Sequence, residues 1–338
     1  MPLTPRPIRR ARVSSLATYV PPRLLTNADL EKLVDTSNEW ILQRTGIEQR
    51  HIVEKGVGTS DLAKEAALVA IARAGLTPAD IDLIIVGTTT PDTLFPSTAC
   101  RLQAKIGAVN AWGFDLGAAC SGFLYGLTTA ANMVAAGASQ RALVVGGDVM
   151  SSIIDYTDRT TCVIFGDGAG AVVVEASDDD RIGVIDFENY VDGNGGAALQ
   201  MPAGGSLMPT TAETVAQRLH YVKQDGQTVF KFAIRNTEEA CRRVLERNNL
   251  TANDIDLFVS HQANRRIIMG AAEKLGLPPE KVIINIERFG NTTAGTIPIA
   301  LDEAVNTGRL KNGDLVMLAS VGAGFTVGAV LIRWGTTA

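Results

Sequence analysis

The chain has 338 residues, enough for about two domains. Its residues are 46% hydrophobic and 20% charged, which is typical of a globular α/β protein and excludes a disordered or fibrous chain. The formal net charge of −5 argues against a general nucleic-acid-binding protein, which needs an excess of basic residues, but leaves room for a local basic patch.

Cysteine usage and hydropathy narrow the class further. The four cysteines form no C-x-x-C pair and the three histidines are scattered, so we expect no metal site, no disulfide scaffold and a reducing compartment. The basic N-terminal segment is followed by no apolar run long enough for a signal peptide, and no run approaches the ~18 residues of a membrane span. We therefore expect a cytoplasmic protein without a nucleic-acid or membrane partner.

Helical and strand-like apolar spacings alternate along the chain, which predicts an α/β fold. Asn27 is a candidate N-cap for a helix that runs to about Val34, and residues 60–75 have helical spacing that ends at Gly75. Short apolar runs typical of buried strands are residues 81–86, 141–146 and 171–175. The segment 191–212, rich in Gly, Ala and Pro, is expected to lie on the surface.

The chain also repeats its own pattern at a spacing of roughly 170 residues. Each copy has a Thr-started turn, a buried strand, an apolar helix that ends at glycine, and a second strand. The matching pairs are Ile81 and Ile255, Cys120 and Asn291, Gly137 and Gly308, and Leu143 and Leu315. We therefore predict two duplicated halves, residues 1–180 and 181–338, which join near residues 177–190.

Cys120 is the candidate nucleophile. It lies in Gly117-Ala-Ala-Cys-Ser-Gly122, between a strand-like and a helix-like run, and its small neighbours leave room for a substrate. The dipole of a helix N-terminus favours the thiolate, which is the form that attacks a thioester. A buried inert cysteine is the alternative. The other cysteines, which lack this setting, are expected to be packing residues; they are Cys100, Cys162 and Cys241.

Two further motifs carry polar groups suited to the same chemistry. His261 follows the buried run 255–259, where a polar side chain is poorly explained by packing, and imidazole handles protons near neutral pH. Asn291, between Gly290 and Thr292, is an ordinary N-cap when taken alone, but the repeat relates it to Cys120. Its amide can donate to a developing enolate oxygen.

Two glycine-rich stretches have different interpretations. The stretch Ser320–Gly328 lies between two predicted strands and can direct backbone N–H groups at an oxyanion. The stretch Gly166–Gly170 resembles part of a dinucleotide-binding fingerprint, but it lies between two strand-like runs instead of a strand and a helix. We therefore interpret it as a close-packed turn, and we expect no cofactor.

Taken together, the motifs resemble those of the β-ketoacyl-acyl carrier protein synthase III family. They are A-C-S-G at 119–122, H-Q-A-N at 261–264, G-N-T at 290–292, E-W-I-L-Q-R-T-G-I at 39–47 and F-G-D-G-A-G-A at 165–171. The resemblance covers nearly the whole chain. It implies a thiolase-like fold in which the two α/β halves pack as a five-layered αβαβα sandwich, and it implies a homodimer.

The resemblance also implies the reaction. A short acyl group, acetyl above all, would pass from acyl-CoA to Cys120 and then condense with malonyl-acyl carrier protein, with loss of carbon dioxide, to initiate fatty acid biosynthesis. His261 and Asn291 would stabilise the enolate, and the backbone amides of Cys120 and Ala323 would form the oxyanion hole.

The same resemblance assigns the binding residues. Trp40 would stack on the CoA adenine, with Arg44 and Arg159 near the phosphates. Asn264 would hold the pantetheine region or a water beside His261, and Phe95 would close the acyl pocket of the partner subunit. A basic patch for the acidic carrier protein would consist of Lys231, Arg266 and Lys274.

Five other functions are possible alternatives to this one. Degradative thiolases use a second C-terminal cysteine, which the glycine turn at 322–328 lacks, and extending synthases have a second histidine where Asn291 stands. Papain-like proteases share the order Cys, His, Asn, but their signature C-G-[SA]-C-[WY] is absent. A non-catalytic binding subunit would have lost one of the three. A related condensing enzyme or acyltransferase of secondary metabolism with the same triad remains the alternative.

Overall fold

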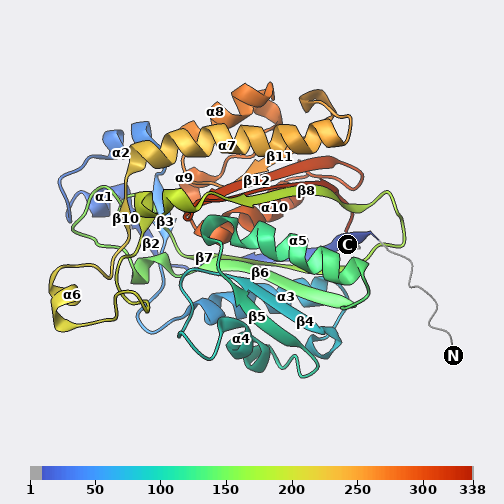
Figure 1. Ribbon diagram of the computed structural model, residues 1–338, viewed down its shortest axis with the longest axis horizontal. Helices are drawn as coiled ribbons and strands as arrows, with labels where there is room; N and C mark the ends of the chain where they lie inside the picture. The colour runs from blue at the N-terminus through green and yellow to red at the C-terminus, as the bar shows by residue number, and fades with distance from the viewer. Residues whose placement is uncertain (1–9, 337–338) are drawn as a thin grey trace.

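Two β-sheets and three layers of helices alternate through the molecule, which a computed structural model describes over residues 10–336 (Figure 1). One helical layer covers the outer face of each sheet, and the third lies between the sheets. This arrangement confirms the five-layered αβαβα sandwich. The basic residues 1–9 lie outside the described part of the chain.

The first sheet has the strand order β1-β7-β6-β4-β5. Its strands are β1 (Ala11–Tyr19), β4 (Leu83–Gly87), β5 (Trp112–Leu116), β6 (Arg141–Asp148) and β7 (Gly168–Ala176). Strand β4 is parallel to β5 and β6, whereas β7 runs antiparallel to β6 and β1. Its outer face is covered by α3 (Thr59–Arg73) and α4 (Thr98–Ile106).

The second sheet has the order β11-β12-β13-β8. Its strands are β8 (Gly183–Val191), β11 (Leu257–Ser260), β12 (Leu315–Gly322) and β13 (Thr326–Arg333). Helices α7 (Gly226–Arg247) and α8 (Arg265–Leu275) form the outer layer, with α7 against the strands. Helices α5 (Gly122–Ala135) and α10 (Thr296–Asn306) lie between the two sheets (Figure 1).

Short elements surround these layers. Strands β2 (Leu24–Thr26) and β3 (Gln49–His51) pair, as do β9 (Leu199–Gln200) and β10 (Lys223–Gln224). The short α-helices are α1 (Asn27–Leu30), α2 (Asn38–Thr45), α6 (Ala212–Ala216) and α9 (Ile286–Phe289). The 3₁₀ turns are η1 (Pro78–Asp80), η2 (Ala119–Ser121), η3 (Met150–Ser152), η4 (Gly193–Ala198), η5 (Ala252–Asp254), η6 (Pro279–Lys281) and η7 (Thr293–Gly295). The segment that carries α6 projects from the body (Figure 1), and most of its residues are exposed.

The expected first helix is shorter than predicted and starts one residue earlier. Thr26, not Asn27, is its N-cap, because the Thr26 hydroxyl accepts from the Asp29 amide while the Asp29 carboxylate accepts from the Thr26 amide. The Asn27 side chain instead turns inward and donates to the Ile47 carbonyl at 2.8 Å. The helix ends at Leu30, so the expectation that it reaches Val34 was wrong.

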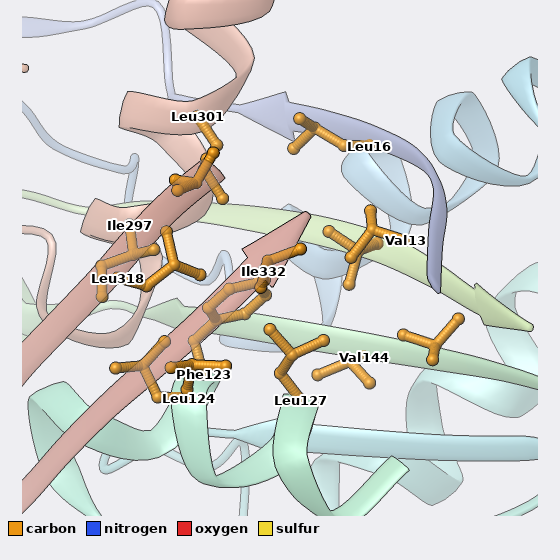
Figure 2. Close-up of a cluster of buried hydrophobic side chains, with 14 of the residues drawn as sticks. Val13, Leu16, Phe123, Leu124, Leu127, Val144, Ile297, Leu301, Leu318 and Ile332 are labelled. Carbon is orange, nitrogen blue, oxygen red and sulfur yellow. The ribbon is translucent and has the colours of Figure 1, made fainter. Parts of the chain in front are cut away.

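The central core is formed where α5 and α10 pack between the sheets. Phe123 and Leu127 from α5, Ile297 from α10, Val144 from β6 and Ile332 from β13 all belong to one buried hydrophobic cluster (Figure 2). All five side chains are buried. Because burial of each such side chain contributes roughly 1.5–3 kcal/mol, this cluster fixes the central helices, whose first turns approach the site, against both sheets.

The turns that precede α5 and α10 share a backbone conformation, at a spacing that differs from the expected one. The 3₁₀ turn before α5 begins at Ala119 with φ +46°, and the one before α10 begins at Thr293 with φ +48°. Cys120 therefore corresponds to Ala294, and the expected equivalence of Cys120 and Asn291 was wrong. The helix ends realign because α5 has 14 residues and α10 has 11.

No helix within residues 10–336 combines the length and apolarity needed to cross a membrane.

Candidate active site

A cavity of about 720 Å³ gathers the three candidate catalytic residues, although they come from distant parts of the chain. Cys120, His261 and Asn291 all line it, together with Trp40 and Arg44. Cys120 lies in η2 beyond the end of β5, and His261 directly follows β11, so the carboxyl ends of strands from both sheets meet here.

The nucleophile turn is fixed to the hairpin between β12 and β13. The Ser320 hydroxyl donates to the Cys120 carbonyl at 2.9 Å, and the Thr326 hydroxyl donates to the Ala118 carbonyl at 2.8 Å. A Cβ on Gly322 would lie 2.7 Å from the Cys120 nitrogen, so only glycine permits this approach. The backbone that leads into the glycine turn therefore runs beside the Cys120 amide.

The resting thiol is protonated, contrary to the expectation of a stabilised thiolate. Burial raises the pKa of Cys120 to about 12, and the Asp148 carboxylate acts in the same direction. Loss of hydration around the sulfur outweighs the favourable dipole of the helix that starts at Gly122. A base must therefore remove the thiol proton before the sulfur can attack.

His261 is held so that one ring nitrogen remains for a substrate. Its backbone N–H donates to the Ala319 carbonyl at 2.8 Å, and its Nδ1 lies 2.6 Å from the Thr296 hydroxyl. The second nitrogen, Nε2, is the one left for chemistry. Burial lowers the pKa of His261 to about 3, so the imidazole is neutral in the resting site.

Asn291 is held both by its backbone and by its side chain. Its amide donates to the Ile164 carbonyl at 3.0 Å, and its carbonyl accepts from the Gly166 amide at 3.0 Å. Its Oδ1 accepts from the Thr293 amide at 2.8 Å, so Nδ2 is the group that remains to donate. Asn291 is not the N-cap of α10, which Gly295 provides.

Two cations lie over the ring of Trp40, which lines the cavity from α2. The guanidinium groups of Arg44 and Arg159 lie 5.8 Å and 5.5 Å from the centre of the Trp40 ring. Asn264 also lines the cavity, but its side chain already bonds to backbone: Nδ2 donates to the Arg44 carbonyl and Oδ1 accepts from the Arg266 amide. Asn264 thus connects α8 to α2 at the edge of the cavity.

The basic residues expected to form one patch do lie near each other. Lys231 and Arg266 line the cavity, and Lys231 and Lys274 line a neighbouring surface hollow. Arg235 lines the same hollow but was not predicted from the sequence. It follows Lys231 by four residues, a spacing that places both side chains on one face of a helix and could have identified it. Phe230, over which the Arg266 guanidinium lies at 5.1 Å, was not predicted either.

Four expected site residues do not line the cavity of the single chain: Phe95, Arg159, Lys274 and Ala323. Phe95 is 85% exposed on the loop before α4. Ala323 follows Gly322 in the hairpin turn, whereas Val321 does line the cavity. Cys100, expected to be a packing residue, is exposed on α4 and that expectation was wrong; the thiols of Cys162 and Cys241 are buried.

Residues 10–336 contain no candidate metal site. Between residues 10 and 336, no three or more His, Cys, Asp or Glu side chains are grouped so that they could hold a metal ion.

Comparison with known proteins gives a consistent set of matches. The family model described as 3-oxoacyl-[acyl-carrier-protein (ACP)] synthase III matches residues 114–193, and the model of its C-terminal part matches residues 245–334. Beta-ketoacyl-[acyl-carrier-protein] synthase III of Koribacter versatilis is 57% identical over 97% of this chain and 98% of the relative. The same enzyme of Solibacter usitatus is 59% identical over 96% of this chain and 99% of the relative.

A solved structure matches equally well. The crystal structure of 3-oxoacyl-[acyl-carrier-protein] synthase III from Aquifex aeolicus has a TM-score of 0.89 to this chain at 42% identity. The match covers 96% of this chain and 100% of the other.

Proposed function

The chain belongs to the β-ketoacyl-acyl carrier protein synthase III family, and we propose that it joins an acetyl group from acetyl-CoA to malonyl-acyl carrier protein through an acyl-enzyme on Cys120. It is thus an acyltransferase and condensing enzyme of fatty acid biosynthesis. The observation that carries the proposal is the single cavity lined by Cys120, His261 and Asn291.

The first half-reaction transfers the acyl group. Nε2 of His261 takes the thiol proton as Sγ of Cys120 attacks the thioester carbonyl. The resulting oxyanion accepts hydrogen bonds from the backbone amides of Cys120 and Ala323. The carbon–sulfur bond to CoA then breaks, and the departing thiolate recovers the proton from the imidazolium. This route suits a resting site in which both the thiol and the imidazole are neutral.

The second half-reaction forms the carbon–carbon bond. Malonyl-acyl carrier protein loses carbon dioxide, and the electron pair of the broken bond becomes an enolate. Its oxygen accepts from Nδ2 of Asn291 and from an N–H at Nε2 of His261. The enolate carbon attacks the thioester on Cys120 and expels the sulfur as a thiolate, which takes one proton from solvent to restore the resting thiol. The product is a 3-oxoacyl chain that is two carbons longer.

The Thr296 hydroxyl allows His261 to serve both steps. It lies 2.6 Å from Nδ1 of His261 and 3.1 Å from the Thr293 carbonyl. With its proton on the carbonyl side it accepts from an Nδ1–H, which leaves Nε2 bare as a base. With its proton toward Nδ1 it supports the other tautomer, in which Nε2 carries the hydrogen-bonding proton.

Substrate binding is assigned to Trp40 and the two cations that lie over its ring. We propose that the CoA adenine stacks on Trp40 and that Arg44 and Arg159 bind its phosphates, because guanidinium groups suit phosphate oxygens. Asn264 supports these residues near the pantetheine arm. The carrier protein, an acidic partner, would bind at the basic patch, which consists of Lys231, Arg235, Arg266 and Lys274.

A cytoplasmic homodimer is the form we propose. Strand β5 lies at the edge of the first sheet, and Trp112 at its start is 55% exposed. An edge strand with an exposed aromatic side chain is suited to pairing with a second copy. Phe95 is exposed on the loop before α4, a helix that packs on β5, so in a dimer it can close the acyl pocket of the partner.

The test is an assay of the purified protein with labelled acetyl-CoA and malonyl-acyl carrier protein, beside Cys120→Ala. We expect a labelled 3-oxobutyryl product and a labelled protein that depends on Cys120. Labelling without product would move the function to another acyl transfer, and no labelling by acetyl-CoA or longer acyl-CoAs would reject the CoA-primed mechanism.

A further inference from the structure

Asp148 is a buried carboxylate at the end of β6 that the mechanism above does not use. It has no exposed surface, and every group within residues 10–336 that donates to it is a hydroxyl or a backbone amide. Its Oδ1 accepts from the hydroxyls of Thr88, Thr89 and Thr90 at 2.9–3.0 Å and from the amides of Thr89 and Thr90 at 2.7 and 3.0 Å. Its Oδ2 accepts from the Thr293 hydroxyl.

These contacts connect the two halves of the molecule beside the cavity. The three threonines follow β4 in the first sheet, whereas Thr293 opens the turn η7 that leads into α10. Only an acceptor satisfies so many donors, so a carboxylate fits this place and a side-chain amide does not. In Asp148→Asn, the side-chain NH₂ group would face either the donors of Thr88–Thr90 or the hydroxyl of Thr293, and could accept no hydrogen bond from them.

Thr293 is held in a backbone conformation that a β-branched residue rarely adopts. Its φ is +48°, in the left-handed region, which is strained for a β-branched residue. In this conformation its backbone N–H points to Oδ1 of Asn291, at 2.8 Å. The hydrogen bond of its hydroxyl to Asp148 holds the residue in place. A chain of two hydrogen bonds thus runs from the buried carboxylate to the catalytic amide.

We propose that Asp148 is a positioning residue for carbon–carbon bond formation, which acts through Thr293 to hold the side-chain amide of Asn291 with Nδ2 toward the enolate. The inference rests on the proposed function. An amide side chain that can rotate offers its oxygen as readily as its N–H, and an oxygen would repel the enolate. Fixing Oδ1 removes that orientation. Acyl transfer to Cys120 does not use Asn291, so it does not need this contact.

The test separates the two half-reactions in Thr293→Val, which keeps the shape of the side chain and removes the hydroxyl. We expect acetylation of Cys120 by acetyl-CoA to stay within about threefold of the unchanged protein. Condensation of the preformed acetyl-enzyme with malonyl-acyl carrier protein should be slower by roughly 10- to 100-fold, since misplacement of a catalytic group has effects of that size. Thr293→Ser, which retains the hydroxyl, should restore the rate to within a few-fold.

The neighbouring residue supplies a matched control. Thr292 is fully buried, and no partner for its hydroxyl is found among residues 10–336. Thr292→Val therefore makes the same chemical change one position away and should leave both half-reactions unchanged. Asp148→Asn should slow condensation at least as much as Thr293→Val; wild-type condensation in Asp148→Asn would overturn the proposal.

A double-mutant cycle distinguishes positioning from a general structural effect. If Thr293 acts through Asn291, Thr293→Val should slow condensation by less than about twofold when Asn291 is already alanine. A multiplicative loss in that background, or equal losses in both half-reactions of the single variant, would overturn the proposal. A wild-type protein that forms no acetyl-enzyme would instead reject the proposed function itself.

Discussion

Gly322→Ala tests whether the hairpin turn must approach the nucleophile as closely as the structure has it. The added Cβ would lie 2.7 Å from the Cys120 nitrogen and from the Thr326 hydroxyl oxygen, and 2.9 Å from the Ala118 carbonyl oxygen. Two of these three atoms belong to the backbone, so no side-chain rotation relieves the contacts. The hairpin and the nucleophile turn must separate by roughly half an ångström to reach ordinary van der Waals distances.

The expected cost follows from that displacement. Because a misplacement of about 1 Å can slow catalysis about 100-fold, a half-ångström shift should lower kcat by roughly 10-fold or more. Overpacking should also lower the free energy of unfolding by about 1–3 kcal/mol. Single-turnover acetylation measures the first effect, because the shift moves an amide of the proposed oxyanion hole, and denaturant unfolding measures the second.

A glycine on the other side of this contact, in the segment that leads to Cys120, supplies the control. A Cβ on Gly117 would meet no atom within 4 Å, so Gly117→Ala should leave the acetylation rate and the stability nearly unchanged. If Gly322→Ala is acetylated as fast as the wild type, the close approach of the hairpin to Cys120 is not needed for acyl transfer. Equal losses in the two variants would lead to the same conclusion.

Three further predictions concern charge and binding. The pKa of His261 is about 3 in the folded protein and 6.5 when exposed, so between these pH values only the unfolded state binds the extra proton. The contribution of His261 to the free energy of unfolding should therefore be complete above pH 6.5 and decline as pH falls toward 3. His261→Gln should flatten this part of the curve of unfolding free energy against pH. Trp40→Ala should raise KM for acetyl-CoA roughly 10-fold with kcat nearly unchanged, because stacking on an aromatic ring contributes about 1 kcal/mol or more to the free energy of binding. An unaltered KM would show that adenine binds elsewhere. Lys274→Glu should raise KM for malonyl-acyl carrier protein several-fold at low salt but leave KM for acetyl-CoA unchanged. Lys311 is exposed just before β12 and lines neither the cavity nor the neighbouring hollow, so Lys311→Glu should change neither KM.

Much of the fold could be predicted because local signals and the global pattern agree. The stop at Gly75 is one example: its φ is +71°, which glycine adopts without strain, and α3 ends at Arg73 just before it. The layer order followed from a resemblance spread over the whole chain. The cap of the first helix was misplaced because Thr26 and Asn27 are both good N-caps, and only the reciprocal bond to Asp29 decides between them.

The site was predicted less completely because its electrostatics depend on burial. A helix N-terminus indicates a thiolate at Cys120, yet desolvation in the folded chain has the larger effect. Neither Asp148 nor Thr293 carries a sequence signal, since their contact joins segments 145 residues apart. The alignment of Cys120 with Asn291 was wrong by three residues because α5 is three residues longer than α10. Sequence spacing alone does not show whether such a difference lies in a helix or in the loop before it.

The central claim is that one thiol carries the acyl group and that the amide opposite it is needed only afterwards. The most direct test is intact-protein mass spectrometry of the wild type and of Asn291→Ala, first with acetyl-CoA and then with malonyl-acyl carrier protein. Both proteins should gain a single acetyl group that maps to Cys120, and only the wild type should lose it rapidly as the 3-oxobutyryl product. Acetylation at another residue, or equally rapid discharge by Asn291→Ala, would contradict the account.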